Sequence, residues 1–294
     1  MPDLLSGQFA IGDLLLGRGT PYIVSSFDPG SPDFTSGDVN LAGEDGTISG
    51  RDTIAGPVFA IEMTVDCQSP SDGRQKWQAL QSSWRNPALR ASPFSVTTFA
   101  AMYQSDVPVV AFGRPRKLDL ADGTFLRVGR VDLQAEFQAS DWRWYSAEEK
   151  TLTLSLIPSD FGSGITWPVT WPVTWGTYSE SLADVVQNEG PSDTWPVITF
   201  KGPVVNPQLT IVGSNLTIGY SGQLLSDQSI TLDTRPWARS ALNQSGGSVA
   251  GSLTGNRLGE FILPSGPTVM KFQGTDATGT SRCEIRYRDA FPTL

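Results

Sequence analysis

The chain has 294 residues, 30 of them acidic and 21 basic, and carries a formal net charge of −9. It contains no histidine, which excludes Ser-His-Asp and Cys-His catalysis and histidine-bound zinc. The length corresponds to about two domains, and 30 glycines with 21 prolines favour an all-β fold of short strands and turns.

The acidity is concentrated in the first two thirds of the chain. Residues 1–200 hold 24 acidic residues against 13 lysines and arginines, whereas residues 201–294 hold 6 against 8. This balance argues against binding of a nucleic-acid backbone, which needs clustered cations. The first residues resemble no export signal, and no apolar run is long enough to span a membrane. We therefore expect synthesis in the cytoplasm, and free, buried thiols at Cys67 and Cys283.

The first domain is expected to contain two long strands and one helix. Residues 58–66 alternate between apolar and polar side chains, as do residues 124–138, where Gly129 is the expected bulge. Between them, apolar residues at helical spacing predict a helix capped by Ser71 or Asp72 and ended by Asn86-Pro87. A strand at 151–157 is expected to close this domain near residue 158.

An unusual aromatic segment follows. Residues 166–175 read Thr-Trp-Pro-Val-Thr-Trp-Pro-Val-Thr-Trp, and Thr-Trp-Pro-Val recurs at 194–197. Proline keeps each preceding tryptophan extended, so residues 159–185 are expected to form a connector that carries aromatic anchors. The candidate interface anchors are Trp167, Trp171, Trp175 and Trp195.

The remaining residues, 186–294, predict a second all-β domain. Short apolar runs at 209–212, 216–218, 230–232, 261–263 and 269–272 are separated by turns, and residues 283–288 alternate cleanly. Five or more short strands of this kind favour a β-sandwich.

Other candidate sites are weak. No sequence motif for a nucleotide, cofactor or metal is present, so none is expected. Residues 43–46 and 119–123 could suggest calcium loops, but they lack the ligand spacing of an EF-hand and favour hairpin turns. The tryptophans could stack on sugar rings, although burial in a core or an interface is the more common role of such residues.

Several motifs together resemble the distal tail proteins of long-tailed bacteriophages (siphophages). In the first half these are Arg114-Pro-Arg116 and the run Phe137-Gln-Ala-Ser-Asp-Trp-Arg-Trp-Tyr145. In the second half they are residues 202–207, Gly222, Ile230-Thr-Leu-Asp233, residues 261–266 and Cys283-Glu-Ile-Arg-Tyr-Arg288. In this family Pro is usual where Trp142 stands.

The resemblance implies a non-enzymatic structural protein of the virion, located at the tip of the tail. The family pattern assigns residues 1–158 to a β-sandwich-like, ring-forming belt domain and residues 186–294 to a galectin-like β-sandwich. It implies a homo-oligomeric ring, six-fold in the family, between the tail tube protein and the hub or baseplate protein, with DNA passing through the channel without specific binding. A channel lined with acidic groups would suit that passage.

Two alternatives stay open at this stage. The runner-up is a tail module that binds a carbohydrate or another host-surface group, and a carboxylate-only glycosidase is a distant third. The two long strands of the first domain favour the ring, because as edge strands they would be exposed in a monomer.

Overall fold

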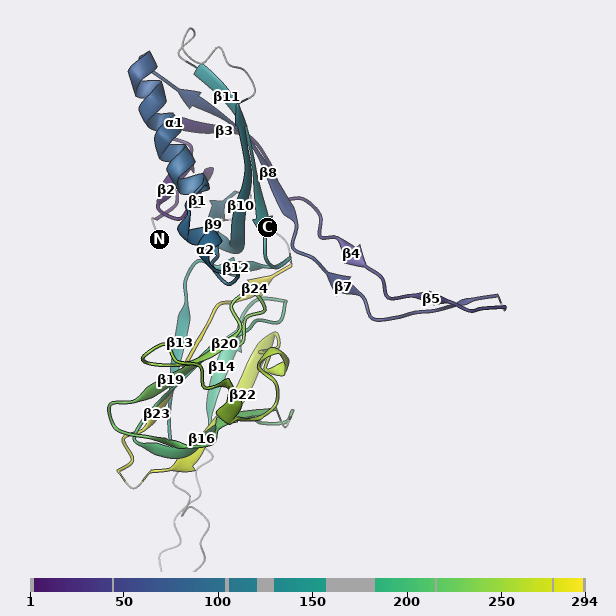
Figure 1. Cartoon of the computed structure of the whole chain (residues 1–294), viewed down its shortest axis with the longest axis vertical. Coiled ribbons are helices and arrows are strands. Elements are labelled where there is room, and N and C mark those ends of the chain that lie inside the picture. The colour runs from purple at the N-terminus through teal and green to yellow at the C-terminus, as the bar shows by residue number, and fades with distance from the viewer. Residues whose placement is uncertain are drawn as a thin grey trace, which may run out of the picture. The chain divides into compact units, whose positions relative to one another are not determined.

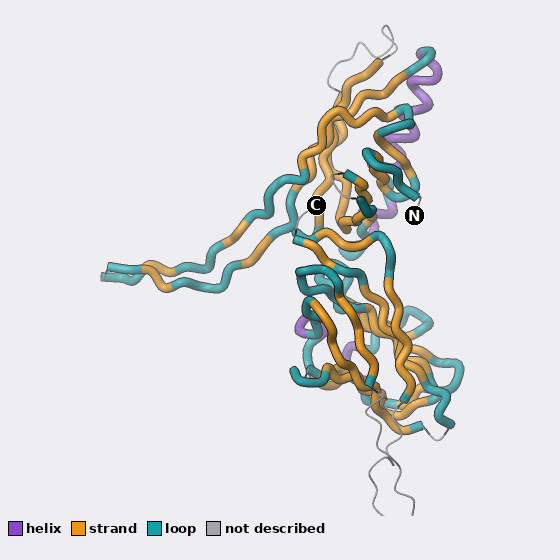
Figure 2. Tube along the Cα trace, turned by 180° about the vertical axis from the view of Figure 1, so that it is seen from behind, coloured by secondary structure: helices purple, strands orange, loops and turns teal. Residues whose placement is uncertain are grey.

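The computed structural model describes residues 3–43, 45–103, 106–120, 130–156, 183–214, 216–276 and 278–292. The chain forms two compact units. Unit 1 comprises Met1–Ala147 with Phe291–Leu294, and unit 2 comprises Glu148–Ala290. Strands dominate both units, and the described residues include a single long helix, which lies in unit 1 (Figures 1 and 2). The expectation of an all-β fold with one helix is therefore confirmed.

Unit 1 is built on one antiparallel sheet with the strand order β2-β1-β9-β10-β11-β8-β3. A short strand, β12, pairs with β10 and with the C-terminal β24. The strands are β1 (Gln8–Ile11), β2 (Leu14–Gly17), β3 (Tyr22–Asp28), β8 (Val58–Asp66), β9 (Thr97–Met102), β10 (Val109–Leu120), β11 (Arg130–Ala139), β12 (Trp144–Ser146) and β24 (Ala290–Phe291).

The alternation seen in the sequence sets the buried face of this sheet. Phe59 on β8 and Phe137 on β11 are opposite each other in the register, and their rings stack with centroids 5.8 Å apart. Both side chains are completely buried, and the other apolar residues of the two strands follow them into the same core. Period-2 patterning thus correctly predicted which side of each strand is buried.

The expectation that β8 and β11 are edge strands is wrong. Strand β8 pairs with both β11 and β3, and β11 pairs with both β10 and β8. Alternation shows that one face of a strand is buried, but it does not show how many neighbours the strand has. Exposed edges at these two strands therefore cannot be used as an argument for a ring.

Helix α1 (Pro70–Trp84) packs on the buried face of the sheet. Its N-cap is Ser69, two or three residues earlier than expected, because Pro70 fits at the first helical position, where no amide donor is needed. The Ser69 hydroxyl accepts a hydrogen bond from Asp72 N, and Asp72 accepts one from Gln68 N. Leu80 and Trp84 are buried as their spacing predicted. A one-turn helix, α2 (Ala88–Ala91), follows.

Unit 2 consists of two antiparallel sheets. The five-stranded sheet has the order β13 (Lys150–Ser155), β23 (Arg282–Tyr287), β15 (Val197–Lys201), β19 (Ser229–Asp233) and β20 (Ser240–Asn243). The six-stranded sheet has the order β14 (Asp184–Asn188), β22 (Gly266–Thr275), β16 (Val204–Ile211), β17 (Thr217–Tyr220) and β21 (Leu253–Gly255), with β18 (Gln223–Leu224) on β16. Two 3₁₀ turns are η3 (Ala250–Ser252) and η4 (Leu258–Glu260).

The two sheets of unit 2 share one core, which confirms the β-sandwich. Phe200 on β15 and Phe272 on β22 stack with ring centroids 5.7 Å apart, and neither side chain is exposed. Cys283 is a free thiol in this core, and Cys67 is a free thiol in the core of unit 1, as expected. Residues 261–263 do not form the expected strand; Leu263 makes a single bridge with Thr194.

The first domain ends earlier than expected. Strand β13, which was expected to close the first domain, pairs along its length with β23 of unit 2. The chain therefore enters unit 2 after Ala147 and not near residue 158, and it returns to unit 1 at Phe291. The alternation of β13 correctly predicts a half-buried strand, but it does not show to which sheet the strand belongs. Most of the expected connector, 159–185, lies outside the described residues.

Candidate functional site: an exposed β-arm

The candidate anchors from the sequence can be located in part. Trp167, Trp171 and Trp175 lie outside the described residues. Trp195 is half-buried in unit 2, where its ring meets that of Trp237 edge-on, with centroids 6.3 Å apart and planes at 76°. Packing of this kind is typical of aromatic residues in a core. Whether any of the four contacts another subunit stays a prediction.

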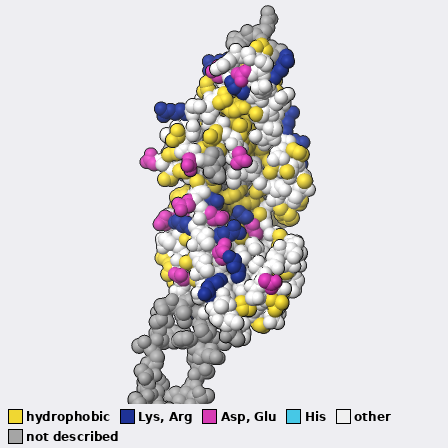
Figure 3. All heavy atoms as spheres, turned by 90° about the vertical axis from the view of Figure 1, so that its left-hand side faces the viewer, with side chains coloured by type: hydrophobic (Ala, Val, Ile, Leu, Met, Phe, Trp, Pro, Cys, Tyr) yellow, Lys and Arg dark blue, Asp and Glu magenta, His cyan; other side chains and the backbone are white. Residues whose placement is uncertain are grey.

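The described residues contain no group of three or more carboxylates and cysteines that could hold a metal ion. No helix in the described part of the chain is long and apolar enough to cross a membrane. On the face shown in Figure 3, lysine and arginine side chains are interspersed with aspartate and glutamate. Among the described residues, two exposed surfaces of unit 1 stand out.

The most prominent such surface is a hairpin that leaves the sheet of unit 1 between β3 and β8 (Figure 1). We call residues 33–55 the arm. Its two sides pair in two short ladders, β4 (Phe34–Thr35) with β7 (Thr53–Ile54) and β5 (Val39–Asn40) with β6 (Thr47–Ile48). At its tip, Leu41 N donates a hydrogen bond to Gly46 O at 3.1 Å. This bond and the ladder beside it agree with the hairpin turn expected at residues 43–46, of which Glu44 lies outside the described residues. Residues 121–123 of the other expected turn, 119–123, also lie outside them.

Two glycines allow the sides of the arm to approach between the ladders. A side chain on Gly50 would collide with the backbone of Gly37, so the two strands can cross here only without side chains. Asp38 links the two sides of the arm at the same place, because its carboxylate accepts a hydrogen bond from Gly50 N at 2.8 Å. The Ser36 side chain also hydrogen-bonds with Asp38. Hydrogen bonds from Ser36 and Gly50 hold the pKa of Asp38 below its ordinary value.

The arm has no core of its own. Every described residue from 33 to 55 is exposed, including large apolar side chains: Phe34 is 67% exposed, Val39 62% and Ile48 58%. A lone two-stranded hairpin is at best marginally stable in water. Several exposed apolar side chains on such a hairpin are typical of a surface that binds another protein. The arm shows no hydrophobic periodicity in the sequence, since strands of two residues are too short to show alternation.

A second surface is the outer face of the sheet in unit 1, opposite the core and α1. The exposed Glu62 on β8 and Asp132 on β11 lie here, and Thr64 donates a hydrogen bond to Asp132 at 2.7 Å. Lys117 lies between two carboxylates, 3.6 Å from Asp119 and 3.8 Å from Glu136. Arg130, which is opposite Asp66 in the register, is exposed on this face as well, so the groups named here are five acidic and two basic.

Comparison with known proteins supplies the fold family. No protein-family model matches the chain, and no curated protein matches its sequence. Solved structures match it over nearly its whole length. The Dit protein of phage SPP1, described as a paradigm of the hub adsorption apparatus in phages that infect Gram-positive bacteria, is 14% identical with a TM-score of 0.56, over 97% of this chain and 98% of that one.

Two structures of the phage P2 baseplate in its activated conformation give the same result. The chain from the Ca structure is 12% identical with a TM-score of 0.57, over 98% of this chain and 99% of its own. The chain from the Sr structure is 13% identical with a TM-score of 0.54, over 95% and 97%. This chain therefore has the fold of phage Dit and baseplate proteins, and the resemblance inferred from the motifs is confirmed at the level of the fold.

Proposed function

We propose that this protein is a structural connector at the distal end of a siphophage tail, where it forms a homo-oligomeric ring, six-fold in our proposal. The observation that carries the proposal is the match to the SPP1 Dit protein, which includes both units and 97% of this chain. Because both units match within one chain, the match supports a two-unit architecture shared with the Dit protein. A match of one β-sandwich alone would carry little weight, because that fold serves many functions.

The arm supports the homo-oligomeric part of the proposal. Exposed apolar residues along residues 33–55 need a partner surface, and identical neighbours in a closed ring provide one for each copy. In this ring unit 1 is the belt domain, and unit 2 is the galectin-like domain that projects outward. The ring joins the tail tube protein on one side to the hub or baseplate protein on the other.

The acidic outer face of the sheet supports passage of DNA without binding. If this face lines the channel, Glu62, Asp119, Asp132 and Glu136 repel the phosphate backbone and keep the duplex from sticking. This arrangement needs no cofactor and no catalytic residue, and it locates the protein in the virion at the tail tip.

Electron microscopy of the purified full chain tests the proposal. Negative-stain images are expected to show a hollow disc, either with the chain alone or after the tail tube protein of the same phage is added. A protein that remains monomeric with and without the tube protein, and binds a host-surface glycan tightly through unit 2, would instead identify the carbohydrate-binding module.

A further inference from the structure

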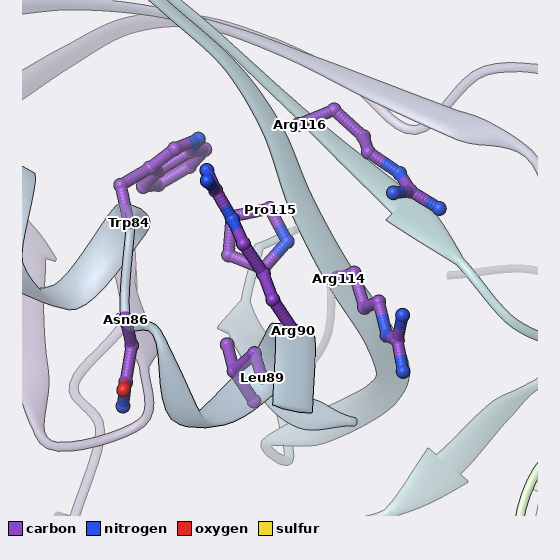
Figure 4. Close-up of a pocket in the computed structure, with 7 residues that line it drawn as sticks. All are labelled: Trp84, Asn86, Leu89, Arg90, Arg114, Pro115 and Arg116. Carbon is purple, nitrogen blue, oxygen red and sulfur yellow. The ribbon is translucent and has the colours of Figure 1, made fainter. Parts of the chain in front are cut away.

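A cavity in unit 1 has the chemistry of an anion-binding site. Its volume is about 240 Å³, and it lies where the end of α1, helix α2 and strand β10 meet (Figure 4). The charged side chains that line it are all arginines, namely Arg90, Arg114 and Arg116. No ion pair joins any of the three to a carboxylate in the described part of the chain.

One of these arginines builds the site. Arg114 donates hydrogen bonds to three successive parts of the loop after α2: from Nε to Ser95 O at 2.7 Å, and from one terminal nitrogen to Ser92 O at 2.6 Å and Pro93 O at 2.9 Å. These bonds fix the end of α2, on which Arg90 lies. Arg90 and Arg116 are exposed. In Figure 4 the Arg90 guanidinium turns toward Trp84, whereas that of Arg116 lies on the other side of β10, at the outer rim of the cavity.

An unpartnered buried donor independently indicates that an acceptor is missing. Trp84 is 2% exposed, and its indole Nε1 has no hydrogen-bond acceptor among the described residues. A buried N–H without an acceptor destabilises the folded state, so such groups normally have partners. In Figure 4 this nitrogen and the guanidinium of Arg90 turn toward the same part of the cavity. An oxygen ligand there would serve both donors.

The apolar lining selects the kind of anion. Leu89, Pro115 and the ring of Trp84 line the cavity beside the arginines. A carboxylate on a short hydrocarbon stem fits both the arginines and the apolar residues of the lining. The planar guanidinium of an arginine donates hydrogen bonds to both carboxylate oxygens, and the stem contacts the apolar side chains. The geometry thus favours an aspartate or glutamate side chain of another polypeptide.

We infer that the cavity receives acidic side chains from the arm of a second copy of this chain; the inference rests on the proposed ring. Between residues 29 and 57 the sequence has five acidic residues and one basic residue. The exposed Asp33, Asp45 and Asp52 form no ion pair in the described part of the chain. The arm therefore supplies carboxylates for the arginines of the cavity and apolar side chains for its apolar lining.

Charge exchange in the full chain tests this inference when the protein assembles. Arg90→Glu with Arg116→Glu is expected to lower the assembled fraction at a given concentration about tenfold or more, since charge-assisted bonds are replaced by repulsion. Adding Asp33→Lys, Asp45→Lys and Asp52→Lys should restore assembly. Arg74→Glu, at an exposed position on α1, is the matched control and should change nothing. Normal assembly of the Arg90 and Arg116 variant, or failure of the arm exchange to restore it, would overturn the inference.

A peptide tests the inference when the chain stays monomeric. The probe is residues 33–55 closed into a loop by a disulfide between added terminal cysteines. It should bind the full chain and shift the indole N–H resonance of Trp84, which is assigned by its loss in Trp84→Phe. A control peptide with Asn and Gln in place of the acids should bind about tenfold more weakly or worse. If both peptides bind equally well, or if neither binds, the proposed site for acidic side chains is contradicted. If the chain stays monomeric but binds the acidic peptide, the cavity site is supported and the ring is contradicted. If a ring forms equally well after substitution of Arg90 and Arg116, the ring is supported and the cavity site is contradicted.

Discussion

Gly37 and Gly50 lie against each other where the two sides of the arm cross, and no side chain fits at Gly50 without displacing the Gly37 backbone. Gly50→Val is therefore expected to separate the strands of the arm. Because the surrounding residues are exposed, the free energy of unfolding should change by less than about 0.5 kcal/mol. Assembly, measured by light scattering, should be lost. The neighbouring Ser49→Ala is the control, and equal loss in both variants would contradict this role of the crossing.

The apolar residues of the arm should matter for assembly and not for folding. Phe34, Val39 and Ile48 are each more than half exposed, so changing all three to Ser removes little buried area in the monomer. We expect an unchanged melting temperature at concentrations where the chain is monomeric and a strong loss of the oligomer. A large fall in melting temperature would mean that the arm packs on its own unit.

The stacked pair in unit 2 should behave in the opposite way. Phe272 is fully buried against Phe200, and Phe272→Ala should lower the free energy of unfolding by about 3–5 kcal/mol. Urea denaturation monitored by tryptophan fluorescence measures this change. Phe34→Ala removes the same atoms from an exposed position and should cost less than about 0.5 kcal/mol.

Asp276 predicts a pH dependence in unit 2. Burial alone would raise the pKa of Asp276, but hydrogen bonds donated by Ser281 N and by Thr278 N and Oγ1 outweigh it and hold this pKa well below its ordinary 3.8. A folded-state pKa below the unfolded one stabilises the protein above about pH 3.8, and this stability is lost as the pH falls through the folded value.

Asp276→Asn, which keeps one acceptor oxygen, should therefore lower the free energy of unfolding at pH 7 by roughly 1–2 kcal/mol. The difference from the unaltered protein should shrink below pH 3.8, as measured by urea denaturation across that range. Asp227→Asn, at an exposed position, is the control. A difference that is constant from pH 7 to pH 3 would contradict the role of the ionised carboxylate.

The sequence predicted the half-buried strands best, because their side chains report burial directly. Strands β8, β11 and β23 show one apolar face each, and they lie where the alternation indicated. For β11 this applies from residue 130 on, because residues 124–129, with the bulge expected at Gly129, lie outside the described residues. Neighbours are not encoded in that pattern, which is why β13 was expected in the wrong domain and β8 was mistaken for an edge. The helix was found from its buried residues, whereas its cap was expected at Ser71 or Asp72 and is Ser69, which is followed by Pro70, a favourable first helical residue.

The assembly surfaces were harder to predict. The size and repetition of the tryptophans made them the predicted interface residues. In the structure, the continuous run of exposed residues is the arm. The arm could not be predicted from hydrophobic periodicity, because its polar and apolar residues follow no regular period. The arginine-lined cavity combines α1, α2 and β10, so Arg90 and Arg116 become neighbours of Trp84 only through the tertiary fold. The sequence motif Arg114-Pro-Arg116 supplied two of its residues but not their role.

The mass of the full-length particle in solution, measured by mass photometry together with negative-stain imaging, tests the connector most directly. A ring predicts a discrete species of six times the 31.7 kDa chain with a central hole, formed alone or on the tail tube protein, and lost when residues 33–55 are replaced by a short glycine-serine turn. A monomer under every one of these conditions, or a ring that forms equally well without the arm, would contradict the account.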